Sequence, residues 1–219
     1  MPELDHVFVC CEEGAPEASA LLRLGLTEGS PNTHPGQGTA SRRFFFRNAY
    51  VELLWVSDAR EAQGEAVRPT RLWERWAARR TSACPFAVSL RPAAASSECE
   101  PPFPTWSYRP QYLPPDLAIE VAAGMPLTEP ALFYIPFARR PDELRREPTG
   151  HAAGVAEITG VEIALPSVEG RSAAARSVET AGVVSFSSGT EYLMTLTLDR
   201  GARGSVADLR PELPLVVRW

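Results

Sequence analysis

Short apolar runs separated by polar, glycine-rich and proline-rich segments make up most of the chain. The first run, Leu4–Cys10, alternates and is rich in Val and Phe, which predicts a strand. Residues 12–26 follow with apolar residues at helical spacing, so we expect a helix. Ser41–Arg47 and Ala49–Val56 are joined by a short turn, which predicts a hairpin. With one short strand in the intervening loop, the N-terminal part predicts the order strand, helix, strand, strand, strand.

This order of elements returns twice further along the chain, which is the strongest sign of its organisation. In the middle part the helix before the last strands is reduced to a loop. We therefore expect a first βαβββ module at 1–58, a helix plus a degenerate middle module at 59–138, a connector at 139–154 and a C-terminal βαβββ module at 155–219. The elements behind this division are a helix at 70–80, strands at 85–92, 117–124 and 131–137, then a strand at 157–166, a helix at 169–180 and strands at 182–188, 190–199 and 213–219.

Modules of this kind predict an α+β protein whose curled mixed sheets surround a cavity, with the helices outside. One module leaves a face of its sheet bare, and modules packed side by side join their sheets around a concave space suited to a small ligand. Alternate side chains of a strand point to the same face. The two sets that we expect to share a face are Leu4, His6 and Phe8 on the first strand and Tyr50, Glu52 and Leu54 on the fourth.

A βαβββ module with histidine in its first strand (LDHVFV) and glutamate in its last (AYVELLWV) resembles the glyoxalase/bleomycin-resistance/extradiol-dioxygenase superfamily, or vicinal oxygen chelate superfamily. THPGQGTASRRFFFRNAYVELLWV and GHAAGVAEITGVEIALP resemble its glyoxalase-like domain branch in particular, and the likeness covers about 4–166. The resemblance implies one divalent metal (Zn, Fe, Mn or Ni) with His6 and Glu52 as ligands. It implies a metal-dependent lyase, isomerase or dioxygenase that acts on a small oxygen-rich molecule, with Glu120 as a candidate base.

Departures from that pattern favour an alternative without a metal. Gly160 and Phe86 stand where later modules would carry histidine, and ALFYIPF offers only Tyr134. His6 and Glu52 are therefore one ligand short of the usual three-ligand catalytic zinc site. The alternative function is metal-free binding or sequestration of a small molecule, as in bleomycin-resistance proteins.

Each candidate residue also has a structural interpretation. His6 is then a hydrogen-bonded core histidine, and Glu52 forms a buried ion pair with Arg42 or Arg43 across the hairpin. In the functional interpretation, Arg43 binds a substrate carboxylate. The remaining candidates for ligand contact are aromatic: Tyr50, Trp106, Tyr108 and Tyr134. The other two histidines, His34 and His151, lie in polar loops, where we expect them to be exposed.

Composition narrows the classes of partner. The formal net charge is −5 and no lysine occurs, so nothing favours nucleic acid or an anionic membrane surface. No run of about 18 apolar residues or signal-peptide pattern is seen, which predicts a cytoplasmic protein with reduced cysteines. No serine or cysteine carries a recognisable nucleophile motif, so hydrolase chemistry is not favoured. A small-molecule ligand is the expected partner, and a homodimer is left open.

Overall fold

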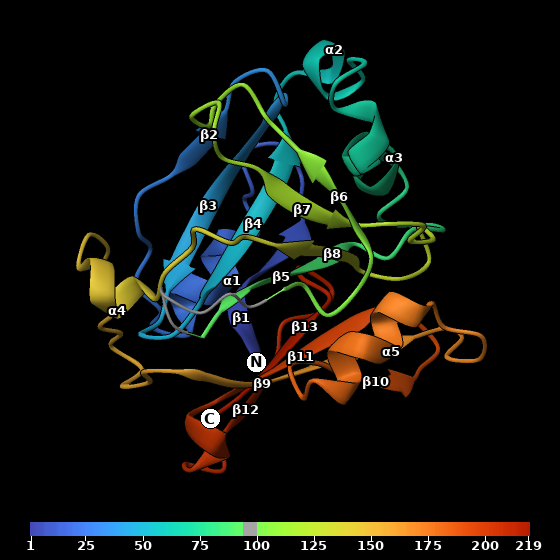
Figure 1. Ribbon diagram of the computed structural model, residues 1–219. Coiled ribbons are helices and arrows are strands. Elements are labelled where there is room, and N and C mark those ends of the chain that lie inside the picture. Colours follow the sequence, from blue (N-terminus) through green and yellow to red (C-terminus); the bar gives the residue numbers. More distant parts are fainter. Residues whose placement is uncertain (94–99) are drawn as a thin grey trace.

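In the computed structural model, which describes residues 1–93 and 100–219, the strand predicted near the N-terminus lies close to the middle of an eight-stranded sheet (Figure 1). Cys99, one of the cysteines that we expect to be reduced, lies outside the described residues. The strands of this sheet are β1 (Pro2–Cys10), β2 (Asn32–His34), β3 (Thr39–Phe45), β4 (Tyr50–Val56), β5 (Phe86–Pro92), β6 (Thr105–Tyr108), β7 (Ile119–Ala122) and β8 (Ala131–Tyr134).

Each half of this sheet comes from one part of the chain. The order β2-β3-β4-β1-β5-β8-β7-β6 places the N-terminal strands on one side and the middle strands on the other. In each half the first strand runs parallel to the last, since β1 pairs with β4 and β5 pairs with β8. The halves meet where β1 and β5 pair antiparallel. The two halves therefore share one strand arrangement.

The helices of the described chain are short and lie around the sheets (Figure 1). None of them is long and apolar enough to cross a membrane. Few, peripheral helices beside curled mixed sheets confirm the predicted α+β class. The helices are α1 (Ala18–Arg23), α2 (Ala59–Ala62), the 3-10 turn η1 (Arg68–Thr70), α3 (Leu72–Ala77), α4 (Pro141–Leu144), α5 (Ala173–Thr180) and the 3-10 turn η2 (Asp199–Gly201).

The C-terminal part of the chain forms a second sheet with its own pairing, in the order β10-β9-β11-β13-β12. β9, the first of these strands in the chain, is parallel to β10, which follows α5, and β11 is parallel to β13. The division into four segments that we expected from the sequence stays a prediction. The strands of the second sheet are β9 (Ile158–Leu165), β10 (Ser185–Ser188), β11 (Leu193–Leu198), β12 (Val206–Asp208) and β13 (Leu215–Arg218).

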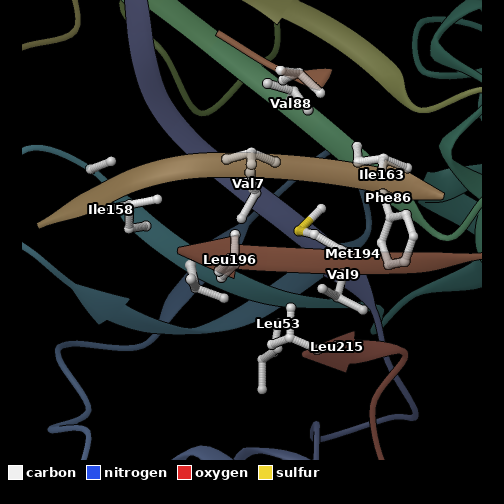
Figure 2. Close-up of a cluster of buried hydrophobic side chains, with 14 of the residues drawn as sticks. Val7, Val9, Leu53, Phe86, Val88, Ile158, Ile163, Met194, Leu196 and Leu215 are labelled. Atoms are coloured by element: carbon white, nitrogen blue, oxygen red, sulfur yellow. The ribbon is translucent and has the colours of Figure 1, made fainter. Parts of the chain in front are cut away.

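The two sheets enclose the main hydrophobic core between them. Figure 2 shows Val7 and Val9 of β1 facing Ile163 of β9 and Met194 and Leu196 of β11. All of these side chains are buried. Burial of this apolar area is the main term that holds the second sheet on the back of the first. The opposite, concave face of the first sheet is left for a ligand cavity.

A β-bulge in β1 changes which side chains face that cavity. The register between β1 and β5 shifts between Leu4 and His6, so Asp5 is the extra residue. The bulge turns Leu4 to the back, where it packs against the main core, whereas His6 and Phe8 face the cavity. The expected common face of all three residues is therefore wrong at Leu4, because a bulge breaks strict alternation.

Candidate functional site

The concave face of the eight-stranded sheet holds a cavity of about 280 Å³. One end of it, the polar end, is built on the central strands β1, β4 and β5 and carries His6, Tyr50, Glu52 and Ser89. The other end is apolar and is partly covered by α3. The polar lining residues are His6, Asn32, His34, Gln37, Tyr50, Glu52, Thr70, Ser89, Tyr108 and Tyr112, and the apolar ones are Phe8, Leu54, Leu72, Leu113, Ile119, Phe133, Ile135 and Phe137.

His6 is the centre of the polar end. Its Nδ1 lies 2.7 Å from Oδ2 of Asp5, and its Nε2 lies 3.0 Å from Oγ of Ser89 and 3.7 Å from Oε2 of Glu52. Its ring stacks on Tyr50 with 4.4 Å between ring centroids. Because an ionised carboxylate only accepts hydrogen bonds, Nδ1 carries the proton and Nε2 faces Ser89 and Glu52. The predicted neighbours His6 and Glu52 are thus brought together.

Glu52 is a buried carboxylate without a hydrogen-bond donor in the described part of the chain. The expected ion pair with an arginine of β3 is not formed. Arg42 pairs with Glu28 at 2.6 Å, and Arg43, although opposite Glu52 in register, donates to the carbonyl of Ser30 at 3.0 Å. Within the described residues, the group that faces this carboxylate is His6.

A second histidine lies in the cavity wall. His34 is buried at the end of β2, which corrects the expectation of an exposed loop residue. Its Nδ1 lies 2.9 Å from Oγ1 of Thr39, its Nε2 lies 2.9 Å from Nδ2 of Asn32, and its ring packs on Tyr112. Burial lowers the pKa of His34 below its usual value, so the ring is neutral at pH 7. With the Asn32 amide donating to Nε2, the proton sits on Nδ1.

The remaining histidine lies away from the cavity. His151 is also buried, and its Nδ1 accepts a hydrogen bond from the backbone N–H of Thr27 at 2.9 Å. Its ring packs on Phe46. Burial lowers its pKa as well. This histidine therefore ties the connector to the N-terminal half and contributes nothing to the site.

Of the aromatic residues that we predicted to contact a ligand and the candidate base Glu120, two line the cavity and three lie elsewhere. Tyr50 and Tyr108 line the cavity, and burial raises the pKa of Tyr108 to about 12, which keeps its hydroxyl neutral. Trp106 packs beside Tyr108 and does not line the cavity. Tyr134 belongs to the core behind the sheet. Glu120 accepts hydrogen bonds from Thr105 and Ser107, on the face of β7 opposite the cavity residue Ile119.

The donor set does not fit a three-ligand metal centre. Among the described residues, no three His, Cys, Asp or Glu side chains are grouped so that they could hold a metal ion. The half of the sheet that is formed by the middle part of the chain, β5 to β8, presents Ser89 and Phe133 to the cavity, where a third ligand would be needed. Phe86, the position at which the sequence resemblance looks for histidine, is buried in the core behind the sheet.

Sequence reasoning missed two residues that complete the polar end. Asp5 and Ser89 both contact His6, and both are nearly inaccessible to solvent. A signal was present for Ser89, which is a polar residue within the apolar strand FAVSLRP. Asp5 had no such signal, because strict alternation placed it on the back of the sheet.

Comparisons with known proteins give one family and several distant structures. A family model described as a glyoxalase-like domain matches residues 4–180. A hypothetical protein from Staphylococcus aureus is 9% identical with a TM-score of 0.56, over 100% of this chain and 98% of that chain, and it supports the fold alone. A Streptomyces coelicolor methylmalonyl-CoA epimerase is 12% identical with a TM-score of 0.41, over 63% and 96% of the two chains. No curated protein matches the sequence.

Proposed function

Because this chain belongs to the glyoxalase-like domain family, we propose that its cavity binds a small neutral molecule bearing hydroxyl groups, without a metal. The observation that carries this proposal is the buried carboxylate of Glu52, which faces a cavity with apolar walls and lacks a donor within the described residues. A hydroxyl group of a ligand supplies that donor.

Charge and burial select the class of ligand. A carboxylate removed from water is costly unless it receives a hydrogen bond or a counter-charge. A hydroxyl donates to Glu52, and the neighbouring Nε2 of His6 offers a second polar contact 3.7 Å away from it. A ligand carboxylate would instead meet the like charge of Glu52. We therefore expect hydroxylated neutral molecules to bind in preference to anions.

Size and wall chemistry define the rest of the ligand. A cavity of about 280 Å³ accommodates one substituted aromatic ring, since dry apolar cavities of about 150 Å³ hold benzene. Phe8, Leu54 and Phe133 provide an apolar surface next to the polar end. A ring with adjacent hydroxyls, such as catechol, matches both ends of the cavity.

Binding should follow this pattern in isothermal titration calorimetry. Catechol and benzyl alcohol are expected to bind and benzoate is not. Glu52→Gln should weaken catechol binding at least ten-fold, about 1.4 kcal/mol, because a hydrogen bond to a charged group is lost. Glu120→Gln is the matched control, since its carboxylate lies on the same sheet outside the cavity. Benzoate binding as tightly as catechol, or equal affinities in Glu52→Gln and wild type, would contradict the proposal.

A metal-dependent enzyme of lyase, isomerase or dioxygenase type is the second candidate. It is favoured by the hydrogen bond from Nδ1 of His6 to Asp5, because a metal-binding histidine commonly donates its other ring N–H to a carboxylate. Metal analysis of the purified protein separates the two. We expect substoichiometric Zn, Fe, Mn and Ni, with the same content in His6→Ala. One metal per chain that is lost in His6→Ala would establish the metal-dependent candidate instead.

A further inference from the structure

At the floor of the cavity, three side chains form a hydrogen-bonded series of the kind that activates a nucleophile. Oγ of Ser89 lies 3.0 Å from Nε2 of His6, and Nδ1 of the same ring lies 2.7 Å from Oδ2 of Asp5. We propose that Ser89 is a nucleophile, with His6 as its base and Asp5 as the residue that orients the base, and that the protein hydrolyses small neutral esters. This inference rests on the proposed function, since the ester would occupy the same cavity.

The bulge in β1 creates this series. In an unbroken strand Asp5 and His6 would point to opposite faces, and no relay between them could form. The register shift between Leu4 and His6 lets the neighbouring side chains meet at hydrogen-bond distance. Pairing of β1 with β5 then places Ser89 directly opposite His6. Nucleophile, base and orienting carboxylate are recognised by these mutual positions and not by sequence order.

The electrostatic surroundings suit a histidine that receives a proton. Arg91, which is almost fully buried, places its Nε 3.9 Å from Oδ1 of Asp5, so a guanidinium lies beside this carboxylate. The carboxylate of Asp5 accepts the hydrogen bond from Nδ1 of His6, so Nε2 is the nitrogen left to accept the proton of Ser89. Glu52, 3.7 Å from the same nitrogen, stabilises the imidazolium that forms when the serine loses its proton.

The reaction requires only the ester and water. Oγ of Ser89 attacks the carbonyl carbon as its proton moves to Nε2 of His6. The bond from that carbon to the alcohol oxygen breaks, and the departing alcohol takes the proton from Nε2. Water then attacks the acyl-serine, passes a proton through His6 to Oγ, and releases a carboxylic acid. Ester and water are thus converted to acid and alcohol, and the side chains return to their initial state.

Ser41 provides an internal control for this assignment. It is also buried, on β3 of the same sheet, opposite the cavity residue Leu54 of the neighbouring strand β4. Its Oγ has no hydrogen-bond partner in the described structure, whereas Oγ of Ser89 contacts His6. The two serines therefore have similar burial, but Ser89 lines the cavity and contacts a base, and Ser41 does neither.

The experiment combines covalent labelling with turnover. Wild-type protein is treated with a fluorophosphonate, the labelled peptide is identified by mass spectrometry, and hydrolysis of phenyl acetate is measured. We expect one label, on Ser89, and a loss of turnover of at least about 100-fold in Ser89→Ala and His6→Gln, with Ser41→Ala like wild type. Asp5→Asn should lower kcat with KM held, because Asp5 acts through His6 and does not touch the ester.

Labelling of wild type needs no variant, so misfolding of Ser89→Ala does not obscure the result. No label on Ser89 and no hydrolysis above buffer, in protein that still binds catechol, would overturn the esterase assignment and leave the proposed function standing. Protein that neither binds catechol nor hydrolyses phenyl acetate would overturn both. Hydrolysis that persists in Ser89→Ala would assign the activity to another group and overturn the role of Ser89.

Discussion

The surroundings of each imidazole determine the role of the three histidines in this chain. His6 has a carboxylate on one nitrogen and a hydroxyl on the other, which makes it a candidate base. His34 is held neutral in the cavity wall, and His151 accepts a backbone hydrogen bond outside the cavity. The sequence placed the last two in exposed loops, because the contacts that bury them come from partners whose positions it does not specify.

The buried histidines should make stability depend on pH. Burial lowers the pKa of His34 and His151 from 6.5, so near pH 6 the unfolded state binds more protons than the folded state. Their contribution to the free energy of unfolding is complete at pH values above the pKa of histidine in the unfolded state. It is lost as the pH falls through that pKa towards the lower pKa values of the folded state. Urea unfolding at about pH 7.5, 6.5 and 5.5 should show this loss, and it should be smaller in His34→Gln. A His34→Gln variant with the wild-type dependence would contradict this account.

At the scale of single elements, the sequence predicted where the strands lie better than it predicted which face of the sheet each side chain occupies. The strand over Leu4–Cys10 and the hairpin that follows are confirmed as β1, β3 and β4, because short runs rich in Val, Phe and Leu that are bounded by turns are typical of strands. In β5 every residue is buried, since both faces of the strand are covered. Without alternation, nothing in the sequence shows that Ser89 faces the cavity and Phe86 the core. The bulge at Asp5 could not be predicted either, since it depends on pairing with β5.

At the scale of the whole molecule, one sheet serves two purposes. The concave face of the eight-stranded sheet carries the cavity, whose lining residues all come from the part of the chain that ends at Phe137. The convex face packs on the C-terminal sheet. The sequence led us to expect repeated modules around a cavity, and it could not specify which sheets join edge to edge and which pack back to back. That choice depends on non-local pairing such as β1 with β5.

This division predicts that stability and ligand binding can be changed separately. Met194 is fully buried between the sheets, so Met194→Ala should lower the free energy of unfolding by about 2–5 kcal/mol. Catechol at 100 times its Kd should still add about 2.7 kcal/mol, as in wild type, because the cavity lies on the other face.

Glu52→Gln should show the reverse, with stability near wild type and a smaller increment from the same catechol concentration. Leu22→Ala, at an exposed position, should change neither quantity by more than about 0.5 kcal/mol. Urea unfolding with and without catechol measures both, and loss of the catechol increment in Met194→Ala would show that the two faces are coupled.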